Sequence, residues 1–132
     1  MVSVTNSLSN FADGGTGFDT VDYTGLAEQI VVNMQGVTEV KVQVGNTANH
    51  HIITSIENII GTAQNDTITG SEGVNTFVGM DGSDTIYGIG GNNIIYGGTK
   101  ERNSTSTAAD TIYGGTGDDT IYGAAGADEV SS

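Results

Sequence analysis

The sequence predicts an all-β fold, a parallel solenoid in which two nine-residue units complete each coil. Three observations predict it. A nine-residue phrase with glycine at its head recurs between residues 61 and 131. Each copy holds one core-type apolar residue, which is too little for a globular core of ordinary thickness but enough for a thin solenoid. No part of the chain has helical periodicity of useful length.

The sixth position of each unit sets the period, because it is an acidic residue or asparagine followed two residues later by a core residue. The sixth positions are Asp66, Asn75, Asp84, Asn93, Asp110, Asp119 and Asp128. The core positions are Ile68, Phe77, Ile86, Ile95, Ile112, Ile121 and Val130. A six-residue loop and a three-residue strand turn the chain through half a coil, so loops two units apart stack about 4.8 Å from each other.

We expect one continuous solenoid domain with two parts. Residues 61–132 form the regular coils, and residues 1–60 form irregular β-rich capping coils that hide the first open edge. One early repeat occupies residues 14–22, and residues 1–10 suggest a short strand or tail. β-rich segments of wider, less regular coils are expected at Gln29 to Met34, Val37 to Val44 and Ile52 to Ile60.

The array is interrupted once, because the spacing from Asn93 to Asp110 is nearly twice the usual nine-residue period. Residues 100–109 carry no core residue and hold two of the three basic side chains. We interpret them as an exposed loop inserted in one coil. The alternative is a degenerate repeat, which would move every later aspartate to the opposite edge.

The charge balance points to cations as partners. The chain has 16 acidic and 3 basic residues, a formal net charge of −13, and 21 glycines. Such a chain is expected to stay disordered until its carboxylates are neutralised, and it does not suit nucleic acid or anionic membrane. The absence of cysteine excludes disulfides and thiolate metal sites. No apolar run predicts a membrane span, and no signal-peptide pattern opens the chain.

The repeat itself favours calcium. Glycine permits positive φ, which lets backbone carbonyls converge between stacked loops, and the sixth-position carboxylates point into the same space. Calcium takes 6 to 8 oxygen ligands at about 2.3 to 2.6 Å, whereas magnesium needs stricter geometry and zinc prefers nitrogen or sulfur. The alternative is that these Asp and Asn residues only form turns, for which both are favoured.

One copy matches a known repeat at every defined position. Gly114-Gly115-Thr116-Gly117-Asp118-Asp119-Thr120-Ile121-Tyr122 resembles the RTX (repeats-in-toxin) nonapeptide G-G-x-G-x-D-x-U-x, and the array covers just over half of the chain. The resemblance implies a right-handed parallel β-roll with two short-stranded parallel sheets. It also implies that several calcium ions bind between the stacked glycine-rich loops.

The resemblance implies ligands from the carbonyls at positions 2 and 4 and the Asp of one loop, with the carbonyls at positions 1 and 3 and the Asp of the loop one coil later. The first site takes Thr62, Gln64 and Asp66 with Gly79, Asp81 and Asp84. The second takes Met80, Gly82 and Asp84 with Gly97 and Asp110 across the interruption. The third takes Asp110 with Gly123, Ala125 and Asp128.

The opposite edge departs from the pattern, since its sixth positions are Glu57, Asn75, Asn93 and Asp119. Asparagine supplies an oxygen but no charge, so we expect weaker or empty sites there. The best of them takes Ile89, Gly91 and Asn93, facing Gly114, Thr116 and Asp119. Calcium is therefore predicted to concentrate on the edge that carries Asp66, Asp84, Asp110 and Asp128.

The resemblance implies a calcium-dependent folding module of a larger bacterial protein, secreted or at the cell surface by type I secretion. The chain ends within a repeat, so we expect it to be part of something longer. No His, Cys, Ser or Lys constellation accompanies the acid pairs, so no enzyme is predicted. The alternative function is an adhesin module that binds polysaccharide or a cell surface through residues 100–109 or an aromatic strip. The strip consists of Tyr87, Tyr96, Tyr113 and Tyr122, for which cross-strand packing is the simpler explanation.

Overall fold

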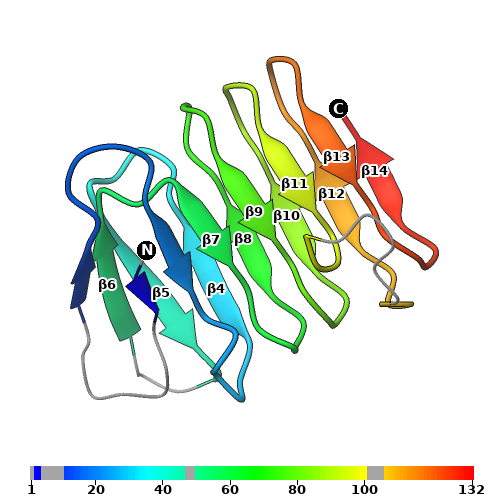
Figure 1. Cartoon of the computed structure of the whole chain (residues 1–132), viewed down its shortest axis with the longest axis horizontal. Coiled ribbons are helices and arrows are strands. Elements are labelled where there is room, and N and C mark those ends of the chain that lie inside the picture. Colours follow the sequence, from blue (N-terminus) through cyan, green and yellow to red (C-terminus); the bar gives the residue numbers. More distant parts are fainter. Residues whose placement is uncertain (1, 4–10, 47–49, 101–105) are drawn as a thin grey trace.

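A computed structural model describes residues 2–3, 11–46, 50–100 and 106–132. The regular structure in these ranges is β-strand, arranged in two sheets that step along the long axis of the molecule (Figure 1). No helix long and apolar enough to cross a membrane occurs in the described part of the chain. The predicted all-β fold with parallel strands in two sheets is confirmed.

The first sheet has six strands among the described residues, in the order β1-β3-β7-β9-β11-β13, and its pairs are parallel. Its strands are β1 (Val2–Ser3), β3 (Thr20–Asp22), β7 (Asn58–Ile60), β9 (Thr76–Val78), β11 (Ile94–Tyr96) and β13 (Thr120–Tyr122). The early repeat therefore joins the roll through β3, which pairs with β7. Residues 4–10 of the expected N-terminal tail lie outside the described residues.

The second sheet has eight strands in the described ranges, in the order β14-β12-β10-β8-β4-β5-β6-β2. Its regular part is β8 (Thr67–Thr69), β10 (Thr85–Tyr87), β12 (Thr111–Tyr113) and β14 (Glu129–Ser131). Its N-terminal part is β2 (Phe11–Asp13), β4 (Ile30–Asn33), β5 (Glu39–Val44) and β6 (His50–Thr54). Sequence neighbours alternate between the two sheets throughout the regular part, as two half-coils require.

The strand register shows that one coil consists of two nine-residue units. Ile68 pairs with Ile86, and Phe77 lies between them in the chain but on the other sheet. The interrupted coil is longer, because Ile86 pairs with Ile112 across the inserted segment. The additional residues are absorbed within one coil, and Asp110 stays on the same edge as Asp84. Residues 101–105 of the proposed loop lie outside the described residues.

Each strand from β7 to β12 buries its middle residue. In β8, Ile68 is fully buried while Thr67 and Thr69 are half-buried, because neighbouring side chains of a strand point to opposite faces. The inward positions form one thin core between the sheets, with threonine and tyrosine outside it. Fully buried members of this core in the regular coils are Ile59, Phe77, Ile95, Ile68, Ile86 and Ile112.

The N-terminal part differs from the predicted wider coils. β5 runs antiparallel to both β4 and β6, so the expectation of coils over this strand is wrong. The first residues of β5 alternate between exposed and buried, which places Val40 and Val42 in the core. Gly36 (φ 69°) and Gly45 (φ 62°) lie in the two connections that reverse the chain, where left-handed backbone favours glycine.

The predicted segment from Ile52 to Ile60 is divided between two strands. It breaks at Ser55, whose φ of 53° turns the chain from β6 in one sheet to β7 in the other.

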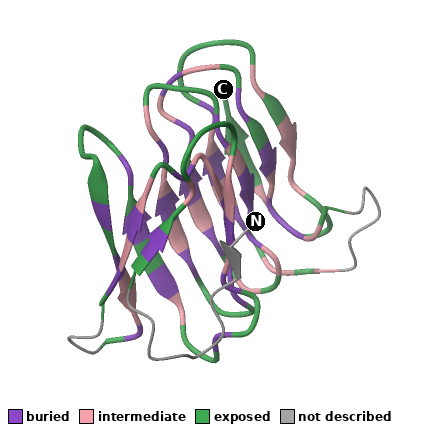
Figure 2. Cartoon of the chain, turned by 60° about the vertical axis from the view of Figure 1, so that its left-hand side comes forward, coloured by how far each residue is buried: buried purple, intermediate pink, exposed green. Residues whose placement is uncertain are grey.

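Burial decreases toward the opposite end of the roll, where Val130 of β14 is 49% exposed (Figure 2).

A matched pair of substitutions tests the thin core. Ile95 of β11 is fully buried and its neighbour Ile94 is 40% exposed. We expect Ile95→Ala to lower the free energy of unfolding by about 2 to 5 kcal/mol, since it removes buried methyl groups and leaves a cavity. Ile94→Ala, the same chemical change one residue away, is expected to cost less than about 1 kcal/mol. Chemical denaturation in saturating calcium measures both, and equal losses would contradict the inward assignment of Ile95.

Candidate metal centre

Two columns of sixth-position residues run along the roll, each immediately before the strands of one sheet. The aspartate edge, before β8, β10, β12 and β14, consists of Asp66, Asp84, Asp110 and Asp128. The asparagine edge, before β7, β9, β11 and β13, consists of Glu57, Asn75, Asn93 and Asp119. The parallel pairing of the strands places successive members one coil apart.

A repeated hydrogen bond holds these side chains in place. On the aspartate edge, each backbone N–H donates to Oδ1 of the aspartate one coil later: Asp66 to Asp84 (2.8 Å), Asp84 to Asp110 (2.8 Å) and Asp110 to Asp128 (3.0 Å). On the asparagine edge, Asn75 donates in the same way to Oδ1 of Asn93 (2.8 Å) and Asn93 to Oδ1 of Asp119 (2.9 Å). Oδ1 of each acceptor side chain is therefore used by the fold itself. The other terminal atom, Oδ2 in aspartate or Nδ2 in asparagine, determines whether the site can bind a cation.

The second oxygen of Asp84 has no donor. Asp84 is 1% exposed, and its buried Oδ2 has no hydrogen-bond partner among the described residues. The same holds for Oδ2 of Asp119. A buried carboxylate oxygen without a donor is unfavourable, because it has lost its hydration without replacement. A cation at this oxygen would remove that cost.

Backbone carbonyls face the same small space. A Cβ atom placed on Gly97 would lie 2.5 Å from Oδ2 of Asp110 and 2.7 Å from the carbonyl oxygen of Gly123 in the next coil. A Cβ on Gly79 would collide in the same way with Oδ2 of Asp84 and the carbonyl oxygen of Gly97. The head glycine therefore leaves a cradle between a carboxylate and a carbonyl, and this oxygen-only donor set suits calcium.

The loop backbone is held in the left-handed region at positions 2 and 4. At position 2, Met80 (φ 80°), Ile89 (φ 75°) and Ala124 (φ 76°) adopt it although they are not glycine. Such residues are strained, and this kind of strain is concentrated at ligand sites. Position 4 is glycine in the same loops, for example Gly82 with φ 101°.

The first predicted site has a different local structure. Thr62 is not among the residues with positive φ, and its backbone N–H donates to Oδ2 of Asp66 (2.6 Å) while its hydroxyl donates to Oδ1 (2.9 Å). The N–H of Ile30 also donates to Oδ1 (2.8 Å). Asp66 is therefore already satisfied by the protein, whereas Asp84 is not. The hydroxyl residue at position 2 is the sequence signal that could have indicated this difference.

The predicted second and third ligand sets come together on the aspartate edge. Gly97 carries the carbonyl nearest the Gly79 cradle, and the N–H of Met80 donates to the carbonyl of Gly98 (3.2 Å), so the two loops are in contact. Gly123 plays the corresponding part beside Asp110. Gln64, Asp81 and Ala125 belong to the same stacked loops, and the carbonyl carbon of Gln64 lies beside Gly82.

The predicted ligands on the asparagine edge are engaged in hydrogen bonds. The carbonyl of Ile89 accepts the N–H of Thr116 (2.9 Å). The carbonyl of Gly114 accepts from Nδ2 of Asn93 (3.3 Å). Gly91 packs against Gly73 and Val74 of the preceding loop. The early-repeat residue Asp19, which the sequence did not single out as a ligand, extends this edge, since its N–H donates to Oε2 of Glu57 (2.8 Å).

Burial sets the electrostatics of the aspartate edge. It raises the pKa of Asp84 to about 8, and the charges of Asp66, Asp110 and Asp81 add to the increase, although the hydrogen bond from the Asp66 N–H opposes it. Burial also raises the pKa of Asp66 and of Asp110. The column therefore resists carrying its full negative charge at neutral pH unless a positive charge joins it.

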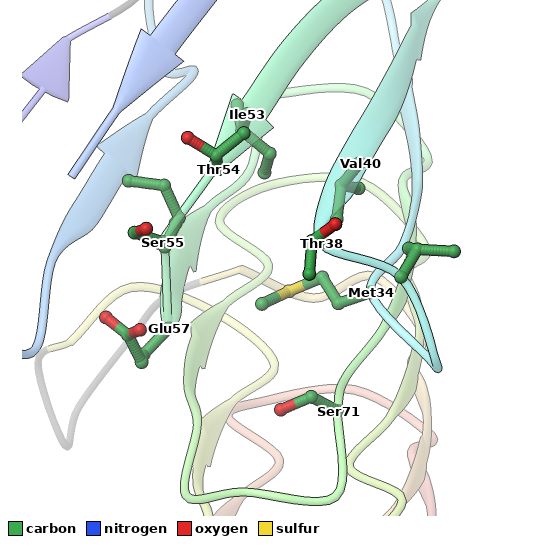
Figure 3. A pocket seen from close by; sticks show the side chains of 10 residues that line it. Met34, Thr38, Val40, Ile53, Thr54, Ser55, Glu57 and Ser71 are labelled. Carbon is green, nitrogen blue, oxygen red and sulfur yellow. The ribbon is translucent and has the colours of Figure 1, made fainter. Parts of the chain in front are cut away.

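A pocket of about 330 Å³ lies toward the N-terminal end of the roll, where Glu57 of the asparagine edge is one of its lining residues. Met34, Val40 and Ile53 line it with apolar surface, and Figure 3 shows Thr54, Ser55 and Glu57 along one wall. No group of three His, Cys, Asp or Glu side chains that could hold a metal is found in the described part of the chain. The cradles of the aspartate edge instead combine a carboxylate with a backbone carbonyl of the next coil.

Comparison with known proteins identifies the repeat. A family model for the RTX calcium-binding nonapeptide repeat (4 copies) matches residues 54–86, 69–99 and 104–132. No curated protein gives a significant match. The matched segments cover more than half of the chain, and they contain all of the aspartate edge. The chain belongs to the family of RTX calcium-binding nonapeptide repeats, as the sequence predicts.

A glycine substitution tests the cradle. We expect Gly79→Ala to raise the calcium concentration needed for folding on the order of tenfold, equivalent to about 1.4 kcal/mol, because its Cβ would collide with Asp84 Oδ2 and the Gly97 carbonyl. The matched control is Gly73→Ala, whose Cβ would meet only Ser71 Oγ at 3.7 Å. Circular dichroism during calcium titration gives both midpoints. Equal midpoints for the two variants would contradict the cradle.

The pKa of Asp84 predicts how pH acts on the calcium-free chain. The folded form holds the Asp84 proton up to a pKa of about 8, whereas the unfolded chain loses it near 3.8. Between these values the folded form binds more protons, so its stability falls as pH rises. We expect acidification across this window to increase the β-structure of the chelator-treated chain, and saturating calcium to abolish that dependence. Circular dichroism at several pH values measures it, and a calcium-free signal that grows with rising pH would be the opposite result.

Proposed function

We propose that this chain is a calcium-responsive folding module in which several calcium ions bind between stacked loops of the aspartate edge. The observation that carries the proposal is the buried, unpartnered Oδ2 of Asp84 in a column of four aspartates, each one coil from the next. Membership of the RTX calcium-binding family supports the choice of metal.

The central site lies between the loops of Asp84 and Asp110. We assign to it these two carboxylates with the backbone carbonyls of Met80, Gly82 and Gly97. The reason is that Asp84 Oδ2 and the Gly97 carbonyl oxygen both face the space beside Gly79. Calcium bound there supplies positive charge and accepts a mixed set of carbonyl and carboxylate oxygens. The chain contributes the positions of those oxygens and excludes water from them.

The neighbouring sites follow from the same geometry. Asp110 and Asp128 with Gly123 and Ala125 form the next site, where the Gly97 cradle joins Asp110 Oδ2 to the Gly123 carbonyl. The site between the loops of Asp66 and Asp84, with Thr62, Gln64, Gly79 and Asp81, is proposed to be the weakest. Its Asp66 oxygens already accept three hydrogen bonds from Thr62 and Ile30, so an ion gains less there.

Calcium binding is coupled to folding in this proposal. The net charge of −13 opposes the compact form, and the thin core offers little apolar burial against it. An ion that binds only the folded form stabilises it by mass action. The chain would then remain unfolded in calcium-poor cytosol and fold after export, which fits a secreted or cell-surface protein that uses type I secretion. The proposed role is structural and involves no catalysis.

The carbohydrate-binding alternative is not favoured by the tyrosine geometry. The four tyrosines of the alternative aromatic strip form two separate pairs on opposite sheets, not one continuous strip. Tyr87 stacks on Tyr113 with ring centroids 5.1 Å apart, and Tyr96 stacks on Tyr122 at 4.8 Å. The rings in each pair are nearly parallel and pack on each other across neighbouring strands, which is the simpler of the two explanations.

Calcium titration with one matched pair of variants tests the proposal. We expect the chain to gain β-structure cooperatively with calcium and to lose it in excess chelator. Asp84→Asn should bind at least one calcium ion fewer, because it removes the unpartnered buried oxygen. Asp118→Asn makes the same charge change at an exposed position and should bind as many ions as the unmodified chain. Circular dichroism and equilibrium dialysis give the two readouts, and a β spectrum unchanged by chelator would refute calcium-coupled folding.

A further inference from the structure

Asn93 places an amide group where the aspartate edge places a carboxylate oxygen. A Cβ atom on Gly88 would lie 2.6 Å from Nδ2 of Asn93 and in collision with the Gly114 carbonyl oxygen. At the corresponding Gly97, the same two neighbours are Oδ2 of Asp110 and the Gly123 carbonyl oxygen. The two cradles thus share a backbone and differ in one atom of the sixth side chain.

That single atom reverses the electrostatics of the cradle. In the aspartate cradle a carboxylate oxygen faces a carbonyl oxygen, and the two repel unless a cation lies between them. In the asparagine cradle Nδ2 donates to the carbonyls of Gly90 (3.1 Å) and Gly114 (3.3 Å). These carbonyls are therefore satisfied by the chain, and the Asn93 side chain carries no charge to neutralise.

We propose that the amide of Asn93 replaces a calcium ion in its coil, so that the side chain of Asn93 determines that this cradle is metal-free. The inference rests on the proposed function. It holds that the side chain at position 93 determines whether this cradle contains a calcium ion or an amide group. Oδ1 of Asn93 keeps the shared coil-to-coil bond, since it accepts the N–H of Asn75 (2.8 Å) as the aspartates do. The partner carboxylate of Asp119 is present, and its Oδ2 is buried without a donor in the described residues.

Asn75, one coil earlier, has its amide turned the other way, because its Oδ1 and not its Nδ2 lies beside Gly70 together with the Gly88 carbonyl oxygen. Its Nδ2 donates to the carbonyl of Glu57 (2.7 Å), and its Oδ1 accepts the N–H and the hydroxyl of Ser71 (3.0 and 3.2 Å). Two consecutive coils of the asparagine edge are thus joined by amide hydrogen bonds without charge. These two coils would form a metal-independent seam opposite the calcium-dependent edge.

The test converts the amide into the carboxylate. Asn93→Asp keeps an oxygen to accept the Asn75 N–H but replaces the donor by an oxygen that faces the Gly114 carbonyl. We expect this variant to bind one calcium ion more than the unmodified chain, and to have less residual β-structure in chelator. Asn92→Asp is the matched control, because it adds the same charge one residue away at an exposed position whose Oδ1 accepts the Asp118 N–H (3.0 Å).

Equilibrium dialysis counts the ions, and circular dichroism with and without calcium follows the fold. One additional ion for N93D and none for N92D supports the inference. An equal count for the two variants overturns it, as does failure of N93D to fold at saturating calcium, since the ion is expected to restore the cradle. Absence of calcium binding by the unmodified chain would instead refute the proposed function, so the two failures are distinguishable.

Discussion

The structure depends on one hydrogen bond, repeated from coil to coil, between the backbone N–H at the sixth position and Oδ1 of the corresponding residue one coil later. This bond requires a short side chain with a terminal oxygen, which Asp and Asn both supply. It holds Asp66 to Asp84 and Asn75 to Asn93 with the same 2.8 Å geometry. It keeps the loops stacked in the same parallel register as the strands of both sheets.

Because Oδ1 is committed to the fold, the second terminal atom is free to determine the chemistry of each coil. In Asp84 it is a buried oxygen without a donor, which favours a cation. In Asn93 it is an amide nitrogen that donates to the facing carbonyl, and in Asp66 it is an oxygen capped by Thr62. The same stacking of coils therefore holds a cradle that favours a cation, one that is satisfied by its own amide, and one, with a different loop backbone, that is capped by Thr62.

The N-terminal part is where sequence interpretation was least successful. Strict alternation over Val37 to Val44 predicts a strand, but alternation does not say which way the strand runs. The antiparallel course of β5 follows from the reversals at Gly36 and Gly45 and from the need to cover Ile53 and neighbouring core residues. Likewise, an apolar run from Ile52 to Ile60 looks continuous until the positive φ of Ser55 divides it between the sheets.

The sequence by itself determined the all-β repeat, the nine-residue period, the inward column that includes Ile68 and Ile86, and the family. Those features depend on local pattern, because each unit repeats the same turn and the same single core residue. Only the tertiary structure decided which tyrosines stack, and which oxygens lack a donor. Those outcomes depend on atoms that lie one full coil apart along the chain and meet only when the coils stack. An aspartate and its capping threonine are near in sequence, but whether Asp84 lacks a donor is decided by the whole coil around it.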